Sequence, residues 1–171
     1  MSLELLLPVE EIAVAHTALQ SDLTLGRKIK IHTKKDGLPN LKNVQIAIIG
    51  ISESRGAVDN IGTGKGLEII RKYLYQMFPG NWHLSLADLG NIPQGNETGD
   101  TYFLIQEILG ELLEQKITPV IIGGSQDITY ASYRAYDRLR KPVNIVSVDN
   151  PVTSNVTLGL ATELNNTSSL Y

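Results

Sequence analysis

From Val44 onward, the sequence alternates between short apolar runs and longer stretches with helical periodicity. The apolar runs are VQIAIIGI, HLSLADLG, TPVIIGG and VNIVSVDN, which start at Val44, His83, Thr118 and Val143. The first intervening stretch carries its apolar residues at the spacing of one helix face, namely Leu67, Ile70, Leu74 and Met77. Strands that alternate with helices connect by right-handed crossovers into a parallel sheet with helices on both faces. We therefore expect an α/β fold, a three-layer α/β/α sandwich with a mainly parallel sheet.

This pattern divides the chain into three segments. Residues 1–43 are expected to be an N-terminal extension, with a helix in VEEIAVAHTAL and a short strand from Lys28 to His32. Residues 44–150 form the α/β domain. Residues 151–171 are a polar tail with no helical stripe, whose only charged residue is Glu163. Because a doubly wound domain would continue with another helix and strand, we expect an incomplete fold and a tail that is non-native or truncated.

Composition excludes several classes of function. The chain has 171 residues, 15 basic and 18 acidic, and a net charge of −3, so no electrostatic reason exists to expect nucleic acid. It has no cysteine, which excludes disulfides, thiolate metal sites and cysteine nucleophiles. No apolar run is long enough to span a membrane, and the N-terminus does not resemble a signal peptide. We expect a cytoplasmic protein.

The topology predicts where a ligand would bind. In open parallel sheets, ligands lie outside the carboxyl ends of the strands. Those ends are expected at Gly50-Ile51, Asp88–Gly90, Gly123–Asp127 and Asp149-Asn150. Carboxylates there could bind a hard cation such as Mg²⁺ or Mn²⁺. For Asp127 we favour a position in the first turn of a helix, where a negative charge suits the helix dipole and Ser125 is the expected N-cap. For Asp149, metal binding and helix capping stay open.

Other motifs give weaker indications of a functional site. GTGKG at 62–66 fails the phosphate-loop pattern, and no G-x-G-x-x-G follows the first strand, so a nucleotide site is not expected. Arg55 and Lys65 follow the first strand and could meet an anionic substrate, although solvated loop charges are the simpler interpretation. None of the histidines, His16, His32 and His83, is expected at a strand's carboxyl end, so each is interpreted as a surface or structural residue.

The order of these pieces resembles the first half of the arginase/agmatinase/formimidoylglutamase (ureohydrolase) superfamily, and formimidoylglutamase-like members most of all. IIGISESRG and GTGKGLEIIRKYL are similar to the family's strand, loop and glycine-initiated helix with an Ile-Arg pair, here Ile70-Arg71. LADLGNI resembles the family's D-x-G-D segment, with Asn91 in place of the second Asp. ITPVIIGGSQDITYASYRAY resembles the strand that leads into G-G-D-H-S, and VNIVSVDN the strand that leads to D-A-H-x-D.

The resemblance implies a centre with two Mn²⁺ ions and a bridging hydroxide that attacks the central carbon of a linear amidine. It also places the family's first-half ligands on Gln126, Asp149, Pro151 and Thr153, so that only Asp149 is a family-type ligand. Gln126 stands where the family has a histidine, inside regular sequence on both sides, and an amide is a far weaker ligand. The family's remaining aspartate ligands belong to its second half.

We therefore expect a ureohydrolase-family protein whose dimetal site is largely lost, inactive as this chain and without a cofactor of its own, acting through binding. The alternative is an active metal-dependent hydrolase of C–N bonds in linear amidines when full length, in which Asp127, Asp149 and later carboxylates hold a rearranged site. An open sheet edge after the fourth strand would also favour a homo-oligomer.

Overall fold

The structure is a computed structural model that describes residues 2–57, 62–81, 83–137, 139–140, 143–144 and 146. The chain divides into two compact units, Met1–Leu139 and Arg140–Tyr171, and every helix and strand below belongs to the first. Within the described residues, no helix is long and apolar enough to cross a membrane. The last predicted strand, which starts at Val143, lies largely outside the described residues.

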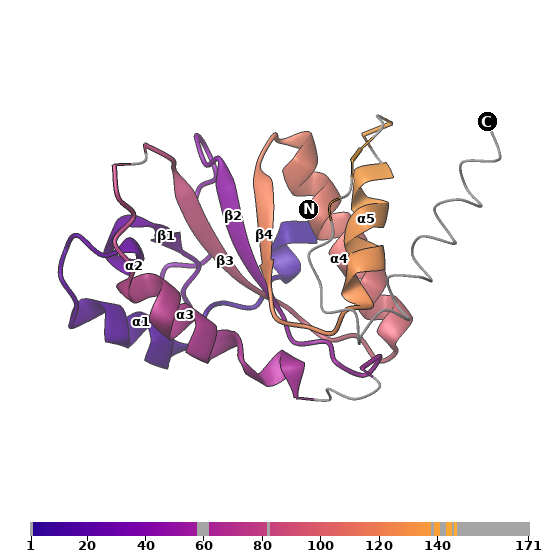
Figure 1. The fold of residues 1–171 in the computed structure, drawn as a ribbon, viewed down its shortest axis with the longest axis horizontal. Coiled ribbons are helices and arrows are strands. Elements are labelled where there is room, and N and C mark those ends of the chain that lie inside the picture. The colour runs from indigo at the N-terminus through magenta and orange to yellow at the C-terminus, as the bar shows by residue number, and fades with distance from the viewer. Residues whose placement is uncertain are drawn as a thin grey trace. The chain divides into compact units, whose positions relative to one another are not determined.

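The sheet of the first unit is parallel, as the alternating pattern predicts. Its strands are β1 (Lys30–Ile31), β2 (Ile46–Ile51), β3 (Leu86–Ile92) and β4 (Thr118–Ile122). Their order is β1-β3-β2-β4, and each neighbouring pair is parallel (Figure 1). The helical elements are η1 (Ser2–Leu5), α1 (Glu11–Ala18), α2 (Leu25–Lys28), η2 (Thr63–Lys65), α3 (Leu67–Gln76), α4 (Thr98–Glu114) and α5 (Ile128–Asp137).

Helices α4 and α5 cover one face of the sheet. Side chains alternate between the two faces along a strand, and Ala47, Ile49 and Ile51 of β2 point to the α4 side. They belong to one buried cluster with apolar residues of β3, α4 and α5. Burying a side chain such as Ile49 contributes about 1.5–3 kcal/mol to folding. This cluster is the main core of the domain.

Helices α1, α2 and α3 form the layer on the other face, and Figure 1 shows them grouped together, away from α4 and α5. Asp88 of β3 lies between Ala87 and Leu89 and therefore points to the α3 side. There it bonds Arg71 and Tyr75 of α3. The three-layer arrangement is thus confirmed within the described residues.

The buried face of α3 differs from the expected apolar stripe. The buried residues are Leu67, Arg71 and Tyr75, whereas Ile70 and Met77 are exposed. The cause lies on the facing strand: buried Asp88 requires a cation and hydrogen-bond donors, and Arg71 and Tyr75 supply them. The helix is therefore rotated so that polar side chains face the sheet. The predicted helix is confirmed, and of the four residues at helical spacing Leu67 is buried while Ile70 and Met77 are exposed.

Residues 2–43 contribute to the domain instead of lying apart from it. Leu3 and Leu6 belong to the core cluster, and β1 extends the sheet beside β3. Leu7 exchanges two backbone hydrogen bonds with Asn91, at 2.9 and 2.8 Å. Gly90 adopts a φ of +88°, and a Cβ there would lie 1.9 Å from the Leu7 carbonyl oxygen, so only glycine permits this approach.

Two local predictions were wrong. Strand β3 continues to Ile92, so Asp88 lies within the strand and not at its carboxyl end. Helix α5 begins at Ile128, three residues after Ser125, and the Ser125 hydroxyl donates to the Glu53 carbonyl oxygen at 3.3 Å. Ser125 therefore links two loops and does not cap the helix. The sequence pattern could not show this, because the partner lies 72 residues away.

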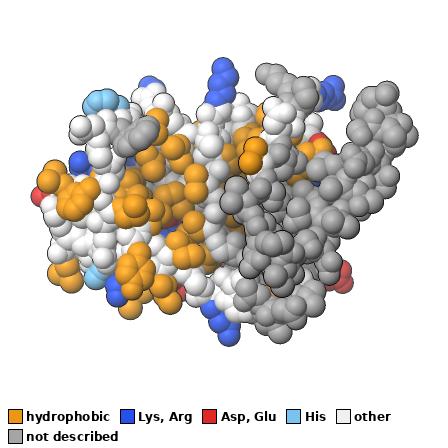
Figure 2. All heavy atoms as spheres, in the orientation of Figure 1, with side chains coloured by type: hydrophobic (Ala, Val, Ile, Leu, Met, Phe, Trp, Pro, Cys, Tyr) orange, Lys and Arg blue, Asp and Glu red, His pale blue; other side chains and the backbone are white. Residues whose placement is uncertain are grey.

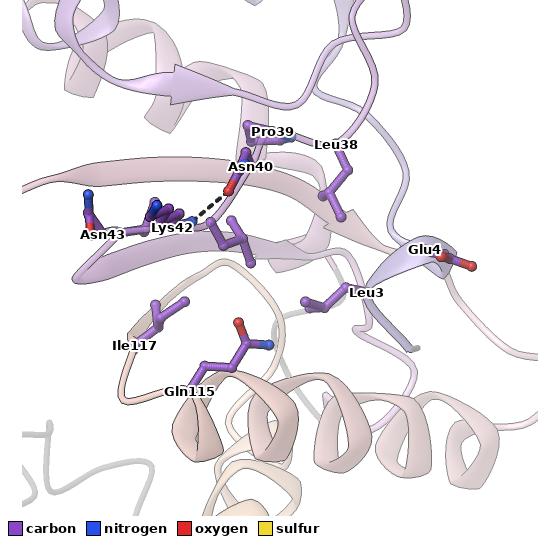
Figure 3. Close-up of a pocket in the computed structure, with 11 residues that line it drawn as sticks. Leu3, Glu4, Leu38, Pro39, Asn40, Lys42, Asn43, Gln115 and Ile117 are labelled. Carbon is purple, nitrogen blue, oxygen red and sulfur yellow. Dashed lines mark hydrogen bonds between the residues drawn. The ribbon is translucent and has the colours of Figure 1, made fainter.

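A pocket of about 650 Å³ opens beside the residues that precede β2 and β4 (Figure 3). Its apolar part includes Leu3, Val44 and Ile117, which are buried. Asn40 lies at its exposed side, where its side-chain oxygen accepts a hydrogen bond from the Lys42 backbone N–H at 2.8 Å. The pocket is at the amino ends of the strands, opposite the edge where the topology predicts a site.

Candidate functional site

The loops that follow β2 and β4 meet at the carboxyl edge of the sheet, as the topology predicts. The Ser125 backbone N–H donates to the Glu53 carbonyl oxygen at 2.9 Å. Gly123 and Gly124 have φ values of +77° and +81°, which turn the chain sharply at the end of β4. A Cβ on Gly56 would lie 2.3 Å from Asp127 Oδ2, so the loop after β2 lies directly against Asp127.

Glu53 and Arg55 form the charged centre of this edge. The Glu53 side chain is fully buried, and its carboxylate accepts Arg55 Nη2 at 2.5 Å and Arg55 Nε at 3.0 Å. It also accepts the Arg55 backbone N–H at 2.9 Å and the Thr101 hydroxyl at 3.0 Å. The hydrogen bond from the Arg55 side chain is the main reason that the pKa of Glu53 falls from 4.5 to about 2. Glu53 is therefore ionised at neutral pH.

Arg55 also ties this loop to the segment that precedes α4. Its guanidinium donates to the carbonyl oxygen of Asn96 at 2.8 Å and to that of Gly95 at 3.1 Å. A further bond reaches the Thr101 hydroxyl at 3.2 Å. The Arg55 side chain is 39% exposed, and each of its three guanidinium nitrogens donates to at least one partner in the protein.

Tyr102 and Asp127 form a second pair beside the first. The Tyr102 hydroxyl donates to Asp127 Oδ2. Burial and the neighbouring Asp127 carboxylate raise the pKa of the Tyr102 hydroxyl, so it stays protonated and acts as a donor. The other carboxylate oxygen, Asp127 Oδ1, is buried and has no hydrogen-bond partner among the described residues. It is an acceptor without a donor.

Of the metal-site residues predicted from the sequence, only Gln126 and Asp127 lie within the described residues. Gln126 is exposed on the loop between β4 and α5, next to Asp127, which directly precedes α5. Asp149, Pro151 and Thr153 lie outside the described residues. The sequence did not indicate Glu53, Thr101 and Tyr102 as site residues, because the Glu53–Thr101 and Tyr102–Asp127 contacts join residues 48 and 25 positions apart and belong to no motif. Only Glu53, two residues after β2, lies beside a strand end.

A second polar network, also missed, joins α3 to β3. Arg71 and Asp88 are both fully buried and form a bidentate pair at 2.9 and 3.0 Å. Asp88 also accepts the Tyr75 hydroxyl at 2.8 Å, and Arg71 donates to Asn91 Oδ1 at 2.7 Å. Burial opposes the charge on Arg71, but its hydrogen bonds to Asp88 raise the pKa of the guanidinium above its usual value. Every strong donor here has a partner, so the network is structural.

The histidines have structural positions as well. His32 is buried, and its Nδ1 lies 2.9 Å from the Leu89 carbonyl oxygen. His16 Nε2 lies 3.0 Å from the Gln76 side-chain nitrogen. Neither is near the loops that follow β2 and β4.

The described residues of the carboxyl edge offer fewer free metal ligands than a two-manganese centre uses. The orphaned Asp127 Oδ1 and the Gln126 side chain are one carboxylate oxygen and one neutral amide. A dinuclear site needs several carboxylate or imidazole ligands. Across the described ranges, no three His, Cys, Asp or Glu side chains are grouped so that they could hold a metal ion.

Comparison with known proteins agrees with this architecture. The sequence model of the arginase family matches residues 44–150, which is well over half of the chain. The chain belongs to the arginase family. Its arginase-family segment includes β2, β3, β4, α3, α4 and α5, and therefore both polar networks described above. No curated protein matches the sequence.

Solved structures with a similar fold include two from Trypanosoma cruzi. One is described as an arginase superfamily protein: it is 25% identical with a TM-score of 0.53, and the match covers 58% of this chain and 37% of that one. Another is a formiminoglutamase with Mn²⁺: it is 24% identical with a TM-score of 0.58, and the match covers 64% of this chain and 41% of that one. This arginase-family chain thus spans well under half the length of either structure.

Proposed function

We propose that this arginase-family protein has a reduced metal site and that the 171-residue chain does not hydrolyse linear amidines. The observation that carries the proposal is Gln126, which stands at the histidine position of the family's metal loop. The Ser125 backbone N–H and hydroxyl both donate to the Glu53 carbonyl oxygen, and these bonds tie the loop that carries Gln126 to the loop after β2. An amide oxygen is neutral and binds Mn²⁺ more weakly than imidazole or carboxylate.

The same edge supports a binding role. Arg55 is neutralised by Glu53, and among the described residues of this edge Asp127 Oδ1 is a buried acceptor without a donor. A small amidine or guanidine carries N–H donors and a positive charge, and both suit a buried carboxylate oxygen. We propose a ligand of this class for the site, bound without turnover. Nucleic acid is not proposed as a partner, because the net charge is −3.

Two further expectations belong to the proposal. The arginase-like segment comprises residues 44–150; residues 1–43 are an N-terminal extension whose described part packs against it, and residues 151–171 are a polar tail. The protein works in the cytoplasm; the absence of cysteine fits a reducing compartment.

Turnover assays test the proposal. The purified chain, supplied with Mn²⁺, is expected to release no product above background from formimidoylglutamate, agmatine or arginine. The alternative, an active hydrolase with rearranged ligands, is favoured by its carboxylates at Asp127 and Asp149. Manganese-dependent turnover that is lost in both Asp127→Ala and Asp149→Ala would establish that alternative and refute the inactive assignment.

A further inference from the structure

The outer face of α3 is apolar where a surface helix is normally polar. Its exposed large side chains are Ile69, Ile70, Tyr73, Met77 and Phe78, the last two directly after the helix, and we call this set the α3 outer face. Figure 2 shows hydrophobic side chains over the part of the surface where Figure 1 places α1 and α3. The apolar side chains are on the outside because Arg71 and Tyr75 point toward the sheet, where both donate hydrogen bonds to buried Asp88.

The α3 outer face carries little charge. Arg71 is fully buried and paired with Asp88, so Lys72 is the only charged side chain between Ile69 and Phe78 that reaches solvent. A single lysine gives no basic field for nucleic acid or for an anionic membrane. The face therefore fits a partner that is itself apolar and uncharged.

The area of this face matches the lower end of what a stable dimer buries. The exposed fractions of the five residues range from 41% to 66%. For side chains with about 200 Å² of surface each, this leaves roughly 600 Å² per chain, or about 1,200 Å² for two copies, the lower limit of standard interfaces. Ile12 of the neighbouring helix α1 and Leu19, which directly follows that helix, are also exposed and could extend the contact.

We propose that the α3 outer face pairs with the same face of a second copy of this chain. Ile69, Tyr73 and Met77 follow one another at intervals of four residues and form the ridge that helices use when they pack together. In a two-fold dimer the contact is isologous, so the middle residue of the ridge lies close to its own counterpart. Tyr73 is that residue. The proposal does not depend on the metal site or on any activity.

Phe103 provides a matched control. It lies on α4, in the opposite layer, and is 63% exposed, close to the 65% of Tyr73. We expect sedimentation equilibrium to show a dimer for the unaltered chain. The double variant Ile69→Lys and Tyr73→Lys should weaken the dimer at least tenfold, whereas Phe103→Lys should not change it. All three altered positions are exposed, so circular dichroism should show a folded protein for each variant.

The absence of cysteine allows a second measurement. Under mild oxidation, Tyr73→Cys should form a covalent dimer through its own counterpart, and Phe103→Cys should remain largely uncrosslinked. A chain that is monomeric at all accessible concentrations would overturn the proposal. So would a dimer that survives the double variant, equal crosslinking at both positions, or a monomer that binds lipid vesicles through this face.

Discussion

Replacing Asp88 with alanine is expected to lower the free energy of unfolding by about 3–5 kcal/mol. The carboxylate is fully buried, and its removal leaves the guanidinium of Arg71 buried without its counter-ion. The Tyr75 hydroxyl and the Gly90 backbone N–H lose their acceptor at the same time.

Urea denaturation measures this effect. The midpoint should fall sharply while the m-value stays constant, because the surface exposed on unfolding is unchanged. The matched control is Asp22→Ala, which removes an arginine partner at the surface. Asp22 is 86% exposed and pairs with Arg27 at 2.9 Å, and a pair of this kind contributes about 0–1 kcal/mol. Equal losses in the two variants would show that the Arg71–Asp88 pair does not stabilise the fold.

The second large effect concerns Glu53 and is pH-dependent. Arg55 stabilises the carboxylate, so the pKa of Glu53 is about 2 in the folded chain and near 4.5 in the unfolded chain. A depressed folded pKa contributes stability that is full above pH 4.5 and is lost as the pH falls from 4.5 toward 2. Because Arg55 is partly exposed, we expect a contribution of about 1–3 kcal/mol after allowance for solvent screening.

Glu53→Gln tests this contribution. At neutral pH the variant should be less stable than the unaltered chain by that amount, and the difference should shrink as the pH approaches 2, where Glu53 itself becomes protonated. Asp22→Asn, at the exposed pair with Arg27, is the control and should differ little from the unaltered chain at either pH. A constant difference between Glu53→Gln and the unaltered chain across this range would mean that the charge of Glu53 is not what stabilises the loop.

The sequence predicted the architecture because a parallel sheet depends on a local signal. The runs at β2, β3 and β4 are apolar and bounded by turn residues, and the stretches between them have helical spacing. That signal identifies elements and their alternation. It does not show which face of α3 is buried, because the orientation depends on Asp88, a residue of a different element. A pattern of apolar residues alone pointed to Ile70 and Met77, which are exposed.

The sequence predicted where the candidate site lies, but it identified only some of the residues that form it. Gln126 and Asp127 were identified because they follow a strand and match a family motif. Glu53 and Tyr102 were not, because a Glu two residues before an Arg and a Tyr within an amphipathic helix are both common in surface segments. Their roles arise from tertiary contacts with Arg55 and Asp127.

We propose above that Gln126, in place of the family's histidine, weakens metal binding at this arginase-family loop. Equilibrium titration with Mn²⁺, followed by electron paramagnetic resonance of the free ion, tests it most directly. We expect the unaltered chain to take up Mn²⁺ more weakly than Gln126→His, which restores an imidazole beside Asp127, while neither holds the spin-coupled pair of ions that the family's centre requires. Tight uptake of two Mn²⁺ ions by the unaltered chain, unchanged in Gln126→Ala, would contradict the claim.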